Sequence, residues 1–225
     1  RAPLWSRGLG DVYKRQANKK HNNLYKKWAN GGVGISVTGN VQIDHRYIER
    51  AGNVVIEGEQ SNESLAALAD WSHAGTQNNT HLWMQLSHAG RQTPFSINKE
   101  SAAPSVQPLP TLGGILKFGV PKELTHSEIL DIVDRFVNAA EIAKQTGFTG
   151  VQLHSAHGYL LSEFLSPNVN QRSDQWGGSI ENRSRLLLTC LLYTSPSPRD
   201  QRGSGIPGWW CKKKSGGGGG GGGGG

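Results

Sequence analysis

Apolar and polar residues follow two different periods along the middle of the chain, and each change of period marks a new strand or helix. A glycine-flanked apolar run over 32–41, GVGISVTGNV, predicts a strand buried on both faces. Alternation over 81–86 predicts a second strand, and the apolar spacing over 62–77 predicts a helix between them. The order strand, helix, strand is typical of parallel strands joined by helical crossovers.

The clearest helix is predicted over 125–146. Thr125 and Glu128 form a capping box in front of an apolar stripe that repeats with the helical period. Gly147 follows at the position where a left-handed residue commonly ends a helix. The remaining predictions are a loop over 91–124, a strand over 151–153 and a helix over 181–188.

These elements suit either an eight-stranded (β/α)8 barrel or an open doubly wound sheet. An open sheet would place a glycine-rich phosphate turn directly after a strand, whereas GGVGIS at 31–36 precedes its strand. Polar residues gather instead at the end of the strand over 151–153, as they do in barrel active sites. We therefore predict an α/β fold, a partial TIM barrel of about three βα units, because a whole barrel uses about 250 residues.

Charge divides the chain into three parts. Between Ala17 and Thr189, 15 Lys and Arg balance 15 Asp and Glu, so the formal net charge of +7 lies entirely in the two ends. The middle part therefore offers no net basic charge to attract nucleic acid or an anionic membrane. We predict translated adapter sequence over 1–16, the partial barrel domain over 17–189, and an artefactual tail with a glycine run over 190–225, both ends being disordered.

The two cysteines, Cys190 and Cys211, both fall in that predicted tail. The domain is therefore expected to hold no thiol for a disulfide, a metal or a nucleophile. No apolar run reaches the roughly 18 residues of a membrane span, and no secretory signal pattern is visible at the start. These features predict a cytoplasmic protein with no membrane partner.

The main chemical signal lies where the strand over 151–153 ends in His154, His157 and Tyr159. Two imidazole N–H groups over one face could hold a carbonyl oxygen and stabilise developing negative charge. The phenol of Tyr159 suits a general acid, and together the groups could reduce an unsaturated carbonyl if a redox cofactor supplied hydride. From spacing alone, a structural histidine pair is an equally good interpretation, and a metal site completed by His88 is a weaker one.

Two further residues are candidates for binding a planar ring. Gln85, in LWMQLSHAGRQTP, offers two donors and one acceptor that could read an imide-like edge such as a flavin pyrimidine. Gly39, at the end of its strand, could let a ring lie against the backbone. A buried glutamine paired with backbone and a tight turn are the alternative interpretations.

Together these residues resemble the old yellow enzyme family of flavin-dependent ene-reductases. The resemblance is to the branch of NADH:flavin oxidoreductases and NADH oxidases related to 2,4-dienoyl-CoA reductases. It runs without a break from about Leu24 to Leu188. The strings that carry it are GGVGISVTGNVQID with GNVVIE, LWMQLSHAGRQTP, and GFTGVQLHSAHGYLLSEFLSPNVNQRSDQWGGSIENRSRLLL.

The resemblance implies an eight-stranded barrel that binds FMN non-covalently at the C-terminal ends of its strands. Gln85 matches the family glutamine that bonds the flavin pyrimidine, and Gly39 matches the small residue against the ring. His154 and His157 match the pair that holds the substrate's carbonyl oxygen, and Tyr159 matches the proton donor. By the family's mechanism, NADH or NADPH reduces FMN, which then passes hydride to an activated alkene such as an α,β-unsaturated carbonyl.

The resemblance also implies that the family's first strand belongs before Ala17 and that the strands holding the FMN phosphate belong after Thr189. The chain as written is therefore expected to be an inactive fragment of an active parent enzyme. Two alternatives stay open. One is a metal-dependent barrel hydrolase that uses His154 and His157, and the other is a non-catalytic barrel that contacts a partner.

Overall fold

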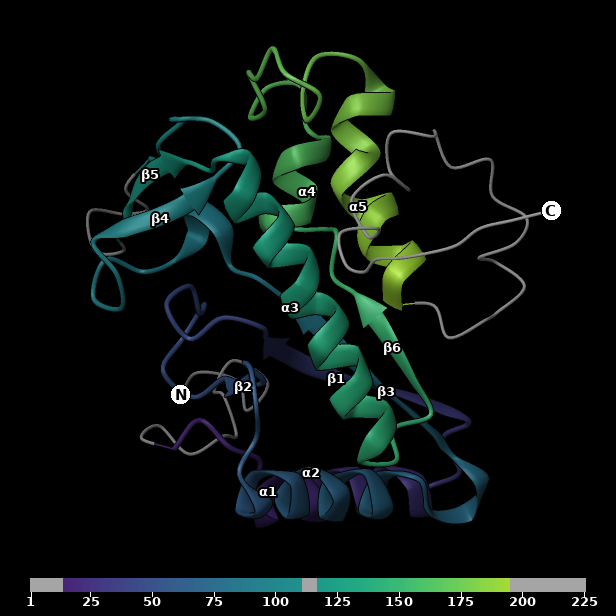
Figure 1. Ribbon diagram of the computed structural model, residues 1–225. Helices are drawn as coiled ribbons and strands as arrows, with labels where there is room; N and C mark the ends of the chain where they lie inside the picture. The colour runs from purple at the N-terminus through teal and green to yellow at the C-terminus, as the bar shows by residue number, and fades with distance from the viewer. Residues whose placement is uncertain (1–13, 111–116, 195–225) are drawn as a thin grey trace, which may run out of the picture. The chain divides into compact units, whose positions relative to one another are not determined.

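The computed structural model describes residues 14–110 and 117–194, which form an α/β fold around a parallel sheet (Figure 1). Four strands lie in the order β2-β1-β3-β6, and each pairing between neighbours is parallel. The elements, in chain order, are α1 (Lys19–Asn30), β1 (Ile35–Gln42), β2 (Val54–Val55), α2 (Asn62–Gly75), β3 (His81–Ser87), β4 (Glu100–Ala103), β5 (Val120–Glu123), α3 (His126–Gln145), β6 (Gly150–Leu153), α4 (Leu160–Leu165) and α5 (Ile180–Thr194), with short 3-10 helices at Gln77–Asn79 and Gly90–Gln92.

The predicted succession of strands and helices is confirmed. β1 is followed by α2, β3 by α3, and β6 by α4 and α5, which makes three βα units. The best-predicted element is α3, where the Thr125 hydroxyl accepts from the Glu128 amide and the Glu128 carboxylate accepts from the Thr125 amide. Gly147 has the expected left-handed φ of 89°.

The two faces of the sheet have different surroundings. On β3, Leu82, Met84 and Leu86 are fully buried because α2 and α3 pack against this strand. Alternate side chains point to the opposite face. There Trp83 lies opposite Val37 of β1, and each keeps 37% of its surface exposed. The face that would line the inside of a closed barrel is therefore open along these residues.

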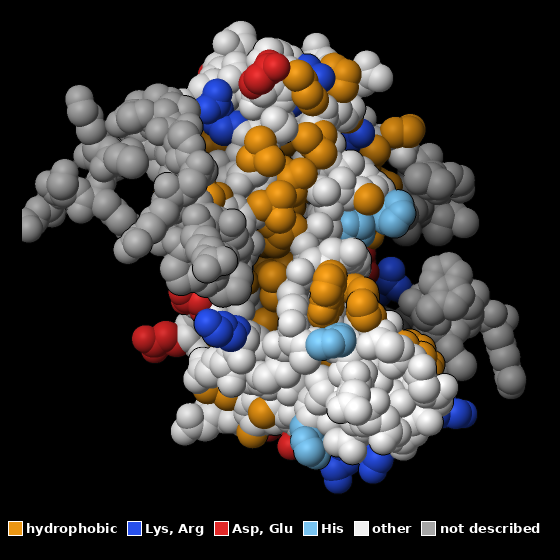
Figure 2. Space-filling view, turned by 90° about the vertical axis from the view of Figure 1, so that its right-hand side faces the viewer, with side chains coloured by type: hydrophobic (Ala, Val, Ile, Leu, Met, Phe, Trp, Pro, Cys, Tyr) orange, Lys and Arg blue, Asp and Glu red, His pale blue; other side chains and the backbone are white. Residues whose placement is uncertain are grey.

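The side of the fold that carries β6 and α5 is also open. Among the described strands, β6 pairs only with β3, so its other edge has no neighbour. Leu188, Leu191 and Tyr193 of α5 are exposed. Figure 2 views the molecule from this side, and it shows hydrophobic side chains gathered in a band. By contrast, α1 and α2 lie side by side and contact each other (Figure 1).

The prediction of an irregular loop over 91–124 is wrong in part. β4 and β5 pair in parallel and form a second, two-stranded sheet within it. Their sequences, ESAA and VPKE, lack both an apolar run and a regular alternation, so the residues themselves give no strand signal. Backbone pairing with each other stabilises them. Residues 111–116 of this segment lie outside the described residues.

Two helices were not predicted, and one runs further than expected. α1 is mostly polar, and α4 is only 6 residues long, so neither shows a helical apolar stripe. α5 continues to Thr194, and the Cys190 thiol inside it is fully buried, with a pKa raised by burial. Cys190 belongs to the buried core, so the expectation of a core without a thiol is wrong. The boundary at 189–190 stays a prediction.

The predicted disorder of the two ends concerns residues that lie mostly outside the described part of the chain. Within that part, no helix combines the length and the apolar character needed to cross a bilayer. The cytoplasmic location stays a prediction.

Candidate active site

One row of polar side chains crosses the open face of the sheet. Asn40 lies opposite Gln85, and Gln85 lies opposite Gln152 in the strand register. The Gln85 amide nitrogen donates to Gln152 Oε1 at 2.6 Å. The register of β1 shifts just before Asn40, and in this irregular stretch the Thr38 hydroxyl accepts from the backbone N–H of Gln85 at 2.9 Å. Gly39, the other residue of the stretch, has open space where a Cβ atom would stand.

A second row lies two residues further toward the C-terminal ends of the strands. Gln42 lies opposite Ser87. His154 follows the last residue of β6, and its backbone N–H donates to the Leu86 carbonyl at 2.9 Å. Alternation along each strand places this row on the same face as Gln85. Both rows therefore meet at the strand ends where the histidine pair begins.

The turn after β6 brings the three predicted catalytic side chains together. The ring centroids of His154 and His157 lie 5.2 Å apart, and those of His154 and Tyr159 lie 4.9 Å apart, with both pairs edge to face. His157 has a left-handed φ of 58°, and Gly158 after it has a φ of 73°. Gln92 stabilises this turn, since its amide nitrogen donates to the His157 carbonyl at 2.6 Å.

Hydrogen bonding and burial fix the protonation of the first histidine. The Ala156 amide donates to His154 Nδ1 at 3.4 Å, so a neutral ring carries its proton on Nε2. Burial lowers the pKa of His154, and the neighbouring His157 lowers it further. At neutral pH, His154 therefore offers a neutral N–H donor.

The phenol of Tyr159 is held by a residue that the sequence did not single out. Its O–H donates to Glu49 Oε2, a carboxylate in the segment between β1 and β2. Burial raises the pKa of Tyr159, and the hydrogen bond to Glu49 raises it further. The phenol is thus fully protonated at neutral pH. The position of Gln152 could have been found from sequence, because it lies two residues before His154 on one strand, whereas Glu49 has no comparable signal.

Gly39 faces a different space from the other candidates. Its backbone N–H donates to the Tyr25 hydroxyl of α1 at 3.2 Å. It also lines a largely apolar cavity of about 840 Å³ between α1, β1 and residues 49–54, to which Trp28 and Glu49 contribute. Gln85 and the histidine pair do not line this cavity. The structure therefore groups four of the five predicted site residues and places Gly39 at the edge of the group.

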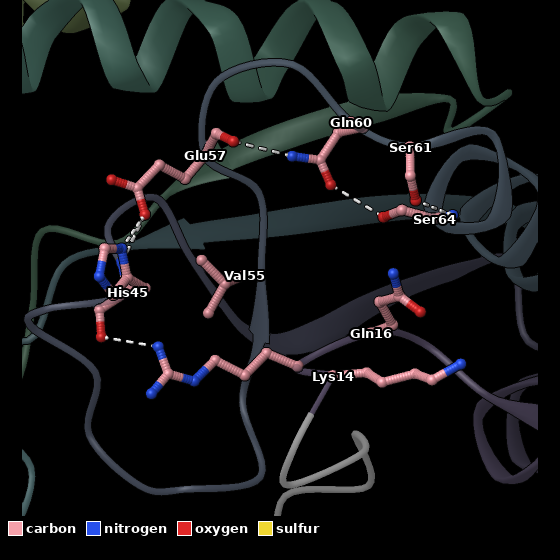
Figure 3. Close-up of a pocket in the computed structure, with 9 residues that line it drawn as sticks. Lys14, Gln16, His45, Val55, Glu57, Gln60, Ser61 and Ser64 are labelled. Carbon is pink, nitrogen blue, oxygen red and sulfur yellow. Dashed lines mark hydrogen bonds and ion pairs between the residues drawn. The ribbon is translucent and has the colours of Figure 1, made fainter.

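A smaller polar cavity of about 220 Å³ lies at the start of α2 (Figure 3). None of the predicted site residues lines it. In Figure 3, His45 is joined to Glu57, and Gln60 is joined to Ser64. The cavity therefore does not belong to the predicted site. The residues lining it are Lys14, Arg15, Gln16, His45, Val55, Glu57, Gln60, Ser61 and Ser64.

Asp44, His45 and Glu57 near this cavity bring three potential metal-ligand atoms within 4.8 Å of one another. Arg46 and Arg135, however, already contact their carboxylates. Arg46 donates to Asp44 at 2.6 Å, and Arg135 donates to Glu57. Two guanidinium charges at this position favour an ion-pair network over a cation site. Among the described residues, His154 and His157 belong to no such group.

Comparison with known proteins identifies the family. The model of the NADH:flavin oxidoreductase / NADH oxidase family matches residues 11–192. The chain belongs to this family. It is 37% identical over 185 residues to the NADH-dependent flavin oxidoreductase iliE of Hypocrea jecorina, covering 76% of this chain and 46% of that protein. It is 38% identical over 172 residues to an NADH oxidase of Thermoanaerobacter brockii, covering 75% of this chain and 25% of that protein.

Solved structures agree with this family assignment. An old yellow enzyme homologue from Zymomonas mobilis superposes with a TM-score of 0.74 at 27% identity, over 84% of this chain and 53% of that one. A 2-naphthoyl-CoA reductase superposes with a TM-score of 0.75 at 25% identity, over 83% of this chain and 29% of that one. The prediction of a partial TIM barrel is confirmed. The chain spans less than half the length of the curated flavin oxidoreductases named above.

This family is named for a flavin, and the sheet face that carries Gln85 has polar side chains that suit one. Both polar atoms of the Gln42 amide, and the Ser87 hydroxyl, are buried without a hydrogen-bond partner among the described residues. Unpaired buried polar atoms are costly, and a polar ligand at the strand ends would satisfy them. Gln85 carries an amide on the same face as Gln42 and Ser87, and Gly39 on the neighbouring strand has open space where a Cβ atom would stand. The residues present therefore fit a flat, polar-edged ring.

Proposed function

We propose that the full-length protein is an FMN-dependent oxidoreductase that uses NADH or NADPH to reduce an activated alkene, such as an α,β-unsaturated carbonyl. The observation that carries the proposal is the grouping of His154, His157 and Tyr159 at the end of β6, beside the polar rows of the open sheet face. In a flavin oxidoreductase family this grouping suits a carbonyl substrate better than a structural role, since His157 is exposed in a left-handed turn.

The histidine pair would bind and polarise the substrate. The Nε2–H of His154 donates as a neutral imidazole, and His157 supplies a second ring nitrogen close to it. Two donors aimed at one carbonyl oxygen stabilise the negative charge that develops there as the alkene is reduced. A neutral donor also spares the site the repulsion between two imidazolium ions.

Tyr159 would supply the proton. Its ring lies edge to face with His154, which places the phenol next to one of the two groups that would hold the substrate. The phenol O–H, protonated at neutral pH, would donate to the carbon next to the carbonyl. We do not assign a direct chemical role to His88, whose ring is completely buried against Tyr47.

The cofactor would be held by Gln85 and Gly39, with Gln42 and Ser87 at the strand ends as further contacts. When bound there, FMN would supply the hydride chemistry that no side chain can provide. The names of two neighbouring structures support a small-molecule substrate and a nicotinamide reductant. One is a complex of 2-naphthoyl-CoA reductase with 2-naphthoyl-CoA, and another is morphinone reductase with tetrahydroNAD.

Tyr159→Phe in the full-length protein tests the reaction. We expect stopped-flow reduction of FMN by NAD(P)H to be largely unchanged. Alkene reduction should slow by about 10²- to 10⁴-fold, the usual contribution of a positioned general acid. Tyr47→Phe is the matched control, because it removes a hydroxyl outside the histidine cluster. Equal loss in both half-reactions would count against the assignment.

We also propose that the 225-residue chain by itself does not retain FMN. The sheet face that should contact the ring leaves Ile35, Val37 and Trp83 exposed, so a flavin bound there would be covered on one side only. Binding that leaves much of a ligand in water is weak. The absorbance of purified chain near the flavin bands decides this point, and a stoichiometrically yellow preparation would refute it.

A further inference from the structure

Glu49 occupies an unusual position for a carboxylate, since its side chain is only 10% exposed and four polar groups converge on it. Oε2 accepts from the Tyr159 phenol and from the Asn40 amide nitrogen, the latter at 2.7 Å. Oε1 contacts Arg50 Nε at 3.1 Å and accepts from the Asn53 amide nitrogen at 3.3 Å. Each carboxylate oxygen therefore has two partners.

The groups around Glu49 are themselves fixed by the fold. The Asn53 amide nitrogen also donates to the Asn40 carbonyl at 3.1 Å, and Asn53 Oδ1 accepts from the Arg50 amide at 2.9 Å. These bonds tie the segment that follows β1 back onto the end of β1. Glu49 thus presents its carboxylate to Tyr159 from a braced position.

We propose that Glu49 is the positioning residue of Tyr159, which anchors the phenol beside His154 and limits how readily its proton reaches the substrate. This inference rests on the proposed function of Tyr159 as a proton donor. Glu49 is hydrogen-bonded to the Tyr159 phenol, so its main effect on the reaction passes through that group. Its charge also opposes the lowering of the His154 pKa, although burial and His157 outweigh it.

The argument is geometric and electrostatic. A phenol has one proton, so while Tyr159 donates to Glu49 it cannot donate to a substrate over the histidine pair. Proton donation requires the hydroxyl to leave Glu49, and the phenolate formed would then face a nearby negative charge. Hydrogen bonds to an ionised partner are about twice as strong as neutral ones, so this restraint is substantial.

The other groups that face Tyr159 do not cancel this effect. Arg50 and the Asn40 amide favour the phenolate, whereas burial and Glu49 oppose it more strongly, and the pKa of Tyr159 is raised as a result. His154 packs against the ring as a neutral imidazole. Removing the charge of Glu49 while keeping its shape should therefore make Tyr159 a stronger acid.

The first test uses the 225-residue chain and needs neither flavin nor turnover. Tyrosine labelled with ¹³C at Cζ reports ionisation of each phenol, and Tyr159→Phe identifies the Tyr159 signal. In the wild-type chain the ¹³C chemical shift of Tyr159 should stay constant up to pH values well above the ordinary tyrosine pKa of about 10. In Glu49→Gln, whose amide oxygen still accepts the phenol proton, ionisation should begin at least about one pH unit lower, a tenfold change in acidity.

Glu59→Gln is the matched control, because Glu59 is exposed and the same charge is lost away from the phenol. It should leave the Tyr159 titration unchanged. Identical titrations in Glu49→Gln and the wild type would overturn the proposal. Whether or not Glu49→Gln folds, as judged by circular dichroism, a wild-type Tyr159 signal that titrates near the ordinary value would overturn the proposal, because the phenol would then not be restrained.

The second test uses the full-length protein and its pH profile. Glu49→Gln should move the alkaline limb of alkene reduction to lower pH by about one unit, and it should speed the protonation step at neutral pH, because the restraint on the phenol is weaker. Glu49→Ala, which loses the anchor as well as the charge, should be about tenfold slower than Glu49→Gln. No alkene reduction by the wild type would refute the proposed function and leave the titration result standing. An active enzyme with identical profiles for wild type and Glu49→Gln would refute the role of Glu49 alone.

Discussion

A buried acid in α4 allows a sharp test of the fold without any cofactor. Glu163 is 1% exposed. One carboxyl oxygen, Oε1, accepts from the Arg91 amide at 2.9 Å, and the other has no partner among the described residues. Burial raises the pKa of Glu163 well above its ordinary value, although the Arg91 amide opposes the shift. In the folded protein Glu163 therefore keeps its proton at pH values where the unfolded chain has lost it.

The size of the effect follows from proton linkage. Above the ordinary glutamate pKa of about 4.3, the unfolded state has released the proton that the folded state still binds. The folded state then holds one more proton, so its free energy of unfolding falls by about 1.4 kcal/mol for each pH unit, until the folded-state pKa is reached. Glu163→Gln cannot ionise in either state, and its curve lacks this slope.

Urea unfolding followed by circular dichroism from about pH 4 to 8 measures the difference between the two chains. Relative to the wild type, Glu163→Gln should gain stability as pH rises, by about 1.4 kcal/mol per pH unit between about pH 4.3 and the folded-state pKa of Glu163. Other titrating groups are common to both chains and cancel in the difference. Glu59→Gln, which removes an exposed carboxylate, should run nearly parallel to the wild type. A Glu163→Gln curve parallel to the wild type would mean that Glu163 is ionised in the folded state, and the reasoning from burial would fail.

Three further changes test other parts of the structure. Thr125→Ala removes the capping box with Glu128 and should lower the free energy of unfolding by about 1 kcal/mol in the same urea assay. Gly90→Ala should cost about 1–3 kcal/mol or more and lower the midpoint of thermal unfolding, since Gly90 has a φ of 58° and an added Cβ would stand 2.8 Å from the Glu163 carboxyl carbon. Burial lowers the pKa of His88 to about 4, so the folded state stays neutral while the unfolded state takes up a proton below about pH 6.5. Stability should therefore fall as pH drops from about 6.5 toward 4, and His88→Gln should flatten that fall in urea titrations.

The elements found from sequence are those whose signals are local. α3 carries a cap, an apolar stripe and a terminal glycine within one stretch of chain, and each feature is confirmed in place. β3 alternates buried and exposed residues with the period of a strand half covered by helices. Such elements can be predicted without knowing what packs against them, because the local pattern of apolar residues already indicates which face is buried.

The elements that were missed depend on partners that a local pattern does not contain. β4 and β5 are strands because each pairs with the other, and Pro121 in β5 argues against a strand when read alone. α1 buries only His21, Tyr25 and Ala29, too narrow a stripe to stand out from a polar segment. Tertiary contact, and not intrinsic periodicity, decides the structure of these segments.

The active site also combines residues that are close in sequence with partners that only the fold brings near. His154, His157 and Tyr159 lie within six residues, so one short string is enough to identify them as candidates. The partner of Gln85 is 67 residues away, and the partner of the Tyr159 phenol is 110 residues away. Register supplies the first pairing, because Gln152 follows from His154 by alternation. The second needs the whole path of the chain after β1. If the carboxylate of Glu49 restrains the phenol as we infer, the acidity of the proton donor is set outside the string that identifies it, and two relatives with the same HSAHGY string could differ in the rate of protonation through the residue at position 49 alone.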